Sequence, residues 1–332
     1  MRSGIDQAHF AHDIRPQDDL YRHVNGDWLR KAVIPADRAV DGGFHMLRDR
    51  SEENVRDIIL ESAKDANATA IARKIGDLYA SFMNEEAIEL SGIEPIKGDL
   101  AAIAAVSNLD EFISLLGRLQ RFGLGGPFHP FVDNDDRQPD RYIVNIWQGG
   151  IGLPDESYYK DAEHEEIRVK YREHITAMLT LAAVDNAKVN AERIYALESA
   201  LAAHHWDRVK CREADLTYNK MTLFELGELT PCFPWKHYLN SVGAPESAFA
   251  EVIVRHPTFL TGMSEVLNDF DLSDWKLWLT WHLISDAAPI LSKAFVDQNF
   301  SFYGTTLSGT PELRERWKRG VGLVEGAMGE AV

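Results

Sequence analysis

The chain has 332 residues, of which 35 are Lys or Arg and 52 are Asp or Glu, so its formal net charge is −17. This acidity disfavours binding to duplex nucleic acid or to an anionic membrane surface, because both depend on Lys and Arg meeting negative charge. A hydrophobic content of 45% is typical of a globular protein, and a chain of this length is expected to form one to three domains.

Amphipathic helices account for most of the predicted structure. Residues 1–17 are polar and mixed in charge, and we predict a flexible N-terminus there. Apolar side chains then recur with helical spacing in four stretches, at residues 71–82, 112–122, 167–182 and 194–205. The sequence therefore predicts a mainly α fold.

Capping residues mark the start of several predicted helices. Asp110 is predicted to cap the helix that carries the stripe at residues 112–122. Thr222 and Glu225 have the spacing of a capping box before a short helix. Ser273 is predicted to cap a Trp-rich helix.

One stretch, near residues 128–148, is predicted to be a small β-hairpin. An apolar segment from Phe128 to Val132 is followed by turn-forming residues at 133–140 and by β-branched and aromatic residues at 142–147. The pair Gly149-Gly150 is predicted to end the second strand.

The C-terminal residues predict a final helix with an unusually apolar face. Thr310 is the predicted cap, and Pro311 occupies the first helical position. The apolar stripe of this helix consists of Leu313, Trp317, Val321, Val324 and Met328. The sequence stops at Val332 without a C-cap glycine or a basic last turn, so we expect the chain to end inside a helix as part of a longer protein.

The N-terminus and the cysteines predict a cytoplasmic protein. The first residues lack the apolar stretch of a secretory signal, and no apolar run approaches the roughly 20 residues of a membrane-spanning helix. Cys211 and Cys232 cannot form a disulfide framework, and a reducing compartment is the simpler interpretation. Export by a non-classical route stays open.

A search for catalytic motifs finds none that is complete. A zinc hydrolase helix needs two His at i and i+4, and none of the 12 His residues are spaced in that way. Arg168 stands where a second ligand would follow His164, and an Arg repels a cation. Residues 133–136 resemble a calcium loop, but Gln138 occupies the position that needs Gly. We therefore expect no catalytic residue, metal site or cofactor in this chain.

Five stretches, in this order, carry a family resemblance. They are Asp18–Leu29 (DDLYRHVNGDWL), Ile34–Arg38 (IPADR), Gly152–Tyr159 (GLPDESYY), Leu216–Leu223 (LTYNKMTL) and Leu307–Pro311 (LSGTP). Each is weak alone, but together and in order they resemble the N-terminal part of the neprilysin/endothelin-converting-enzyme family of zinc metallopeptidases. The resemblance covers the chain from about Asp18 to its end.

The resemblance implies an architecture and a role. It identifies residues 18–332 as the mostly helical N-terminal lobe, which faces a zinc-containing catalytic lobe across a closed chamber. The H-E-x-x-H motif belongs to that C-terminal domain, which this sequence lacks, so zinc is a cofactor of the full-length family. The implied function is a noncatalytic lobe that forms the substrate chamber and helps bind oligopeptides. Its implied partners are the C-terminal domain and a peptide substrate.

The resemblance also assigns two candidate substrate-binding residues. In the family, an Arg after the Ile-Pro segment can contact the C-terminal carboxylate of the substrate, and Arg38 matches that position. Arg48 matches a second family Arg nearby. A guanidinium suits this task because its planar fork pairs with a carboxylate, although a surface ion pair explains both residues equally simply. The alternative function is a stand-alone helical protein-binding module without peptidase activity, and an enzyme of different chemistry is a third hypothesis.

Overall fold

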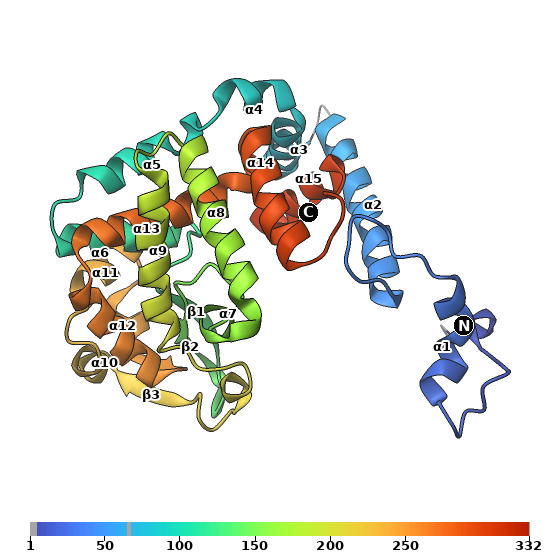
Figure 1. Cartoon of the computed structure of the whole chain (residues 1–332), viewed down its shortest axis with the longest axis horizontal. Coiled ribbons are helices and arrows are strands. Elements are labelled where there is room, and N and C mark those ends of the chain that lie inside the picture. Colours follow the sequence, from blue (N-terminus) through green and yellow to red (C-terminus); the bar gives the residue numbers. More distant parts are fainter. Residues whose placement is uncertain (1–4, 65–67, 332) are drawn as a thin grey trace. The chain divides into compact units, whose positions relative to one another are not determined.

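The computed structural model describes residues 5–64 and 68–331, and Figure 1 draws their helices and strands. The chain divides into two compact units. The first unit joins the segment up to Met83 with the segment from Ser308 onward, and the second comprises Asn84–Leu307. Each unit has a buried apolar cluster of its own. The predicted lobe of residues 18–332 spans both units.

The first unit is built from helices. They are α1 (Leu20–Lys31), α2 (Gly43–Lys64), α3 (Ala70–Met83) and α15 (Arg316–Met328), with the 3₁₀ turns η1 (Gln7–His9) and η7 (Gly329–Ala331). Its core forms where α2, α3 and α15 pack together and bury Ile59, Ile75, Tyr79, Val321 and Val324. Gly320 permits the close approach of α15 to α3, because a Cβ at this position would lie 2.9 Å from the Tyr79 ring.

Residues 5–31 contain a short capped helix with a local packing contact. The Asp19 carboxylate accepts a hydrogen bond from the Arg22 backbone N–H at 2.8 Å and so caps α1. Ala11 is fully buried and packs on Gly26 of α1, where any side chain would collide with its methyl group. Of the predicted flexible N-terminus, residues 1–4 lie outside the described part of the chain, as does Val332.

The predicted helix start at Thr310 is wrong. Helix α15 begins at Arg316, and the residues before it take an irregular path. Two long-range interactions hold this path: the Glu312 N–H donates to the Ala36 carbonyl at 3.0 Å, and the Arg314 guanidinium binds the Glu52 carboxylate. These tertiary contacts override the local signal for a helix. The C-terminal stripe is nevertheless confirmed at Val321 and Val324, which are fully buried.

The second unit combines many helices with a small sheet. Its longer helices are α5 (Glu94–Ala105), α6 (Leu109–Arg121), α8 (Glu165–Leu181), α9 (Ala187–Ala202), α12 (Pro257–Asp269) and α13 (Leu272–Ala287). Its shorter helices are α4 (Glu85–Ser91), α7 (Ser157–Lys160), α10 (Leu223–Leu229), α11 (Trp235–Val242) and α14 (Lys293–Asn299), and α14 continues into a π-helical segment, η6 (Phe300–Leu307). The 3₁₀ turns are η2 (Ala162–His164), η3 (Lys210–Arg212), η4 (Glu246–Phe249) and η5 (Ala288–Ile290).

The sheet contains the predicted hairpin and two further strands. Its strands are β1 (Phe128–Asp135), β2 (Gln138–Gln148), β3 (Asn219–Thr222) and β4 (Glu251–Val254), in the order β1-β2-β4-β3. The pair β1–β2 is antiparallel, which confirms the hairpin, whereas β4 runs parallel to β2. The sequence did not predict β3 and β4, because four residues are too few for a periodic pattern to emerge.

Three of the predicted apolar stripes contribute to the core of the second unit, but the prediction is wrong at Phe122, which is 79% exposed. Helices α8 and α9 lie side by side in Figure 1, and the stripe residues that they bury completely are Tyr171, Ile175, Met178, Ile194, Leu197 and Leu201. The capping box at Thr222 and Glu225 is confirmed at the start of α10. The predicted fold class, mainly α with one hairpin, is therefore confirmed.

Two predicted helix caps of this unit are each wrong by two residues. Helix α6 is capped by Asn108 rather than Asp110, since the Asn108 side chain accepts a hydrogen bond from the Glu111 N–H at 2.9 Å. Helix α13 starts one residue before Ser273, and Asp271 takes the cap position.

In the described residues, the helices are all too short or too polar to cross a lipid bilayer.

Candidate functional site

The first candidate residue, Arg38, is held by three carboxylates. Its Nη2 atom donates to both oxygens of Asp49 at 2.9 and 2.8 Å, its Nε atom donates to Asp37 at 3.3 Å, and its Nη1 atom donates to Asp41 at 3.4 Å. Only 10% of the side chain is exposed. The hydrogen bond to Asp49 raises the pKa of the Arg38 guanidinium, although burial opposes this shift. We call Arg38 and these three aspartates the Arg38 cluster.

A lysine extends the Arg38 cluster toward the C-terminal helix. Lys318, on α15, places its Nζ atom 3.3 Å from Asp37. Burial works against ionisation of Asp37, but the hydrogen bonds from Lys318 and Arg38 lower the pKa of its carboxyl below the usual value. The cluster therefore joins the loop after α1 to α15 through charge-assisted hydrogen bonds.

The second candidate residue, Arg48, is more accessible. It lies on α2 next to Asp49, and 49% of its side chain is exposed. Its Nε atom is 3.4 Å from the Glu52 carboxylate, which is 8% exposed and is bound mainly by Arg314 at 2.8 and 2.6 Å. Among the described residues, the two Nη groups of Arg48 have no partner. Arg48 can therefore accept an external anion without giving up an ion pair, whereas Arg38 cannot.

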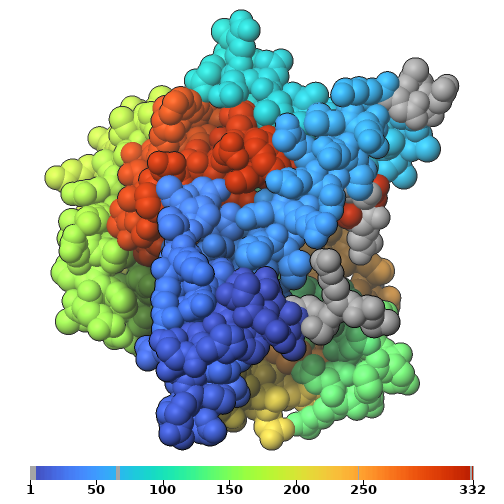
Figure 2. All heavy atoms as spheres, turned by 90° about the vertical axis from the view of Figure 1, so that its right-hand side faces the viewer, coloured from blue at the N-terminus to red at the C-terminus, as the bar shows by residue number. Residues whose placement is uncertain are grey.

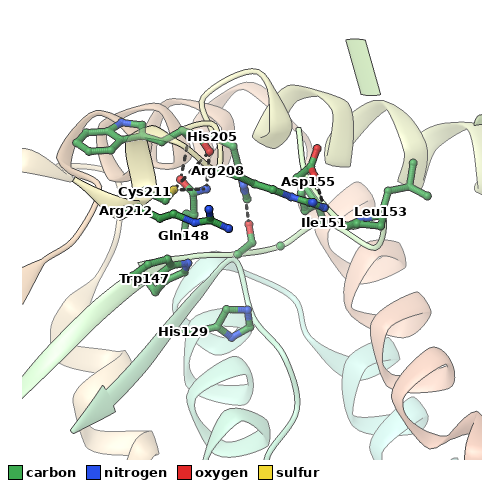
Figure 3. Close-up of a pocket in the computed structure, with 14 residues that line it drawn as sticks. His129, Trp147, Gln148, Ile151, Leu153, Asp155, His205, Arg208, Cys211 and Arg212 are labelled. Atoms are coloured by element: carbon green, nitrogen blue, oxygen red, sulfur yellow. Dashed lines mark hydrogen bonds and ion pairs between the residues drawn. The ribbon is translucent and has the colours of Figure 1, made fainter. Parts of the chain in front are cut away.

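The second unit contains a cavity that the sequence did not predict. It measures about 580 Å³ and lies between the start of β1, the segment after β2 and the segment after α9. Figure 3 shows the side chains of these three segments around it. We call it the β2-end cavity, and its lining consists of His129, Trp147, Gln148, Gly149, Gly150, Ile151, Leu153, Pro154, Asp155, His205, Trp206, Arg208, Cys211 and Arg212.

Hydrogen bonds between the segments fix the wall of the β2-end cavity. The Gln148 side chain donates from Nε2 to the Trp206 carbonyl at 2.9 Å and accepts from the Trp206 N–H at 2.9 Å. The His205 Nε2–H donates to the Gly149 carbonyl at 2.9 Å. Position 149 favours glycine, because a Cβ would lie 2.9 Å from the Gly126 carbonyl oxygen and 2.7 Å from the His129 ring. Gly150 has φ of +89°, a conformation that side chains other than glycine rarely adopt.

Burial keeps the cavity's histidine and cysteine uncharged. It lowers the pKa of His205 to about 4 and raises the pKa of Cys211 to about 11. His129 is open to the cavity, yet the surrounding protein lowers its pKa as well. The fixed charges are therefore Arg212 and the pair of Arg208 with Asp155, whose atoms approach to 2.5 Å. At neutral pH the lining carries two cations and one anion.

The sequence contained one signal for this cavity. The glycines after β2, from Gly149 to Gly152, were interpreted only as the end of a hairpin, but they also let the His129 ring and the Leu201 side chain approach the backbone. The residues after α9 gave no comparable signal. Within residues 5–64 and 68–331, no group of three or more His, Cys, Asp or Glu side chains is arranged to hold a metal ion.

Comparison with known proteins adds a family context to this geometry. The model of Peptidase family M13 matches residues 16–332. The neutral endopeptidase of Lactobacillus helveticus is 28% identical over 323 residues, which cover 96% of this chain and 50% of that protein. Membrane metallo-endopeptidase-like 1 of Mus musculus is 27% identical over 348 residues, which cover 96% of this chain and 45% of that protein.

A solved structure matches nearly the whole chain. The crystal structure of the Mycobacterium tuberculosis zinc metalloprotease Zmp1 in complex with an inhibitor is 45% identical and superposes with a TM-score of 0.94. The match covers 99% of this chain and 51% of that one. The chain therefore spans about half the length of the relatives that it matches.

Proposed function

Because this chain belongs to peptidase family M13, we propose that it is the noncatalytic N-terminal lobe of a neprilysin-like zinc metalloendopeptidase. In this role it forms part of the substrate chamber and helps bind oligopeptides, while a C-terminal domain hydrolyses them. One observation carries the proposal: 99% of the chain superposes, with a TM-score of 0.94, on about half of a zinc metalloprotease.

The histidine spacing supports assigning the zinc chemistry to the other domain. Zinc polarises a peptide carbonyl and activates water when two helical His residues at i and i+4 help to hold it. None of the 12 histidines in the sequence have this spacing. His205 donates its Nε2 proton to a backbone carbonyl, and burial holds His174 and His256 in their uncharged forms inside the protein.

An exposed apolar segment supports the proposed partner. We define it as residues 20–58, which Figure 2 draws in blue. Its exposed large hydrophobic side chains are Leu20, Tyr21, Leu29, Val33, Ile34, Val40, Phe44, Met46, Leu47 and Ile58. Exposed apolar side chains are frequent in this one segment, and such side chains favour an interface with another protein. The C-terminal half of a family M13 peptidase is the partner that the length comparison suggests.

The two arginines have different proposed roles in peptide binding. Arg48 is half-exposed and has free donors, so we assign it the direct contact with a peptide carboxylate. Arg38 is already bound by Asp37, Asp41 and Asp49, so it can contact a peptide only if one of them moves away. Its first task is to fix the loop that precedes α2.

Reconstitution tests the proposed function. The purified chain is assayed for bound zinc and for cleavage of a quenched fluorescent peptide, alone and after co-expression with the C-terminal half of the Mycobacterium tuberculosis relative. We expect zinc-dependent cleavage only in the presence of that half. Stoichiometric zinc linked to peptidase activity in the chain alone would refute the proposal. Stable monomers that neither bind the C-terminal half nor restore cleavage would instead support the stand-alone binding module.

A substitution at Arg48 tests the peptide contact in the reconstituted enzyme. We expect Arg48→Gln to raise KM for a peptide with a free C-terminal carboxylate by about tenfold and to change kcat little, because the contact is made equally in the ground and transition states. Arg50→Gln, at an exposed arginine two residues away, is the matched control. An equal KM for the two variants excludes the direct contact.

A further inference from the structure

The β2-end cavity presents hydrogen-bond donors that have no partner in the described part of the protein. The Arg212 side chain makes no ion pair, and the Trp147 indole N–H makes no hydrogen bond, in the described residues. Figure 3 shows the guanidinium of Arg212 and the nitrogen-bearing edge of Trp147 turned toward the same space. The two groups come from separate segments, since Trp147 lies near the end of β2 and Arg212 lies in η3.

The amide oxygen and the carboxylate that line the same cavity are already used. The Gly149 carbonyl accepts from His205, and the Gln148 side-chain oxygen accepts from the Trp206 backbone. Asp155 accepts from the backbone and hydroxyl of Ser157 and pairs with Arg208. Among the described residues, the cation of Arg212 is therefore left without a counter-ion while the one carboxylate of the lining is paired, and this arrangement favours an anionic group.

The volume and the lining residues of the β2-end cavity indicate which class of anion fits it. The apolar residues Ile151, Leu153 and Pro154 form part of the wall, so the ligand has an apolar portion beside its charge. A volume of about 580 Å³ accommodates the side chains of a short peptide segment but is larger than a single inorganic ion needs. A planar carboxylate matches the fork of a guanidinium, and the pair of Arg208 with Asp155 already has this chemistry at the cavity wall.

We propose that the β2-end cavity binds a carboxylate of a peptide, held by the guanidinium of Arg212 with the indole N–H of Trp147 as a second donor. The proposal rests on the proposed function in taking the ligand to be a peptide. It adds a binding site that is distinct from Arg38 and Arg48 and lies wholly within the second unit. Asp155 competes with the ligand, because its carboxylate occupies Arg208, the other cation of the cavity.

Direct peptide binding to the purified chain tests this site without any need for catalysis. A fluorescein-labelled peptide is measured by anisotropy in four forms: with a free C-terminus and a Glu side chain, with only one of these carboxylates, and with neither. We expect the form without either carboxylate to bind at least about tenfold more weakly than the form with both. The two single-carboxylate forms show whether the α-carboxylate or the Glu side chain occupies the cavity. Inorganic phosphate serves as a competitor, and full displacement of the peptide at low millimolar phosphate would contradict a carboxylate site.

Three variants and a control assign the binding to the cavity. We expect Arg212→Gln to weaken binding by about tenfold and Trp147→Phe by about threefold, because each removes a donor and leaves the wall in place. Asp155→Asn keeps an oxygen for Ser157 but releases Arg208, so we expect binding to become severalfold tighter. Arg118→Gln removes a half-exposed arginine that does not line the cavity, and it should leave the affinity unchanged.

A second measurement separates a binding effect from a folding defect. In ¹H–¹⁵N spectra, Trp147→Phe identifies the indole cross-peak of Trp147, and the peptide should shift this peak in the wild-type protein. Unchanged affinity in Arg212→Gln, with no shift of the Trp147 peak, overturns the cavity site even if reconstituted cleavage succeeds. The absence of binding by every peptide form also overturns it. Reconstitution with the C-terminal half tests the proposed function independently.

Discussion

A single buried imidazole, that of His174 on α8, links the stability of the second unit to pH. Only 2% of this residue is exposed, and its ring stacks on Phe302 with the centroids 4.9 Å apart. Its Nδ1 atom accepts a hydrogen bond from Gln298 at 3.2 Å, while its Nε2 atom has no partner among the described residues. Burial lowers the pKa of His174 to about 3, so the ring stays neutral in the folded protein.

We predict that His174 causes a loss of stability between pH 6.5 and pH 3. In this window the unfolded chain binds a proton at His174 and the folded chain does not, so the free energy of unfolding falls as the pH falls. At pH 5 the expected loss from this residue is about 2 kcal/mol. In urea unfolding at pH 7 and pH 5, His174→Phe should reduce the difference between the two pH values by about that amount. A variant with the wild-type pH dependence would contradict this explanation.

His174 is not the sole source of acid sensitivity among the described residues. Burial also lowers the pKa values of His205 and His256, to about 4 in each case. These two residues should leave part of the acid sensitivity in the His174→Phe variant. His237→Phe changes a histidine whose side chain is 45% exposed, and we expect it to preserve nearly all of the wild-type pH dependence. The contrast between His174 and His237 therefore isolates the effect of burial.

At the scale of elements, one ion pair anchors the segment that leads into α15. Arg314 binds Glu52 of α2, whose side chain is 8% exposed. Removing one partner of a buried pair leaves an uncompensated charge, which typically costs about 3–5 kcal/mol. Arg314 is 27% exposed and Arg48 lies 3.4 Å from the same carboxylate, so we expect the lower end of this range.

We predict that Arg314→Met lowers the free energy of unfolding of the first unit by about 3 kcal/mol. Urea unfolding measures this loss, and hydrogen exchange should locate it in α15 and in the residues just before it. The double variant Glu52→Gln, Arg314→Met should recover part of the stability, because it removes both charges. If the double variant is as unstable as the single one, the buried charge is not the cause.

The elements that the sequence predicted correctly are those with a local pattern. The stripes of α8 and α9 repeat over several turns, and the capping box at Thr222 and Glu225 is complete within four residues. The start of α15 was misplaced because Arg314 and Glu312 form bonds to residues far away in the sequence. Helix prediction from neighbouring residues takes no account of hydrogen bonds between residues far apart in the sequence.

The candidate site likewise contains residues to which the sequence pointed and a cavity to which it did not. Arg38 and Arg48 are candidates because their positions match the family resemblance, whereas their different accessibility depends on Asp37, Asp49 and Glu52. The β2-end cavity was missed because three separate segments build it. The glycines after β2 are the one sequence feature that relates to this cavity, and a tight turn accounts for their presence equally well.

For the whole molecule, the proposed partner rests mainly on the uneven distribution of exposed apolar side chains. Phe44 is 90% exposed and Leu47 is 65% exposed, and both lie in the apolar segment at the start of α2. Such side chains contribute little to the stability of the free chain, but each can contribute about 1.5–3 kcal/mol when a partner buries it. The segment should therefore matter for assembly rather than for folding.

We predict that the double variant Phe44→Ser, Leu47→Ser binds the C-terminal half of a family M13 peptidase at least about tenfold more weakly than the wild-type chain. Its thermal unfolding should change little, because both side chains are exposed in the free chain. Phe122→Ser, at a residue that is 79% exposed in the second unit, is the matched control and should bind normally. Affinity is measured by calorimetry or by the recovery of zinc-dependent cleavage. If the double variant binds as tightly as the control, the apolar segment is not the docking surface, and the C-terminal half must bind elsewhere on the chain.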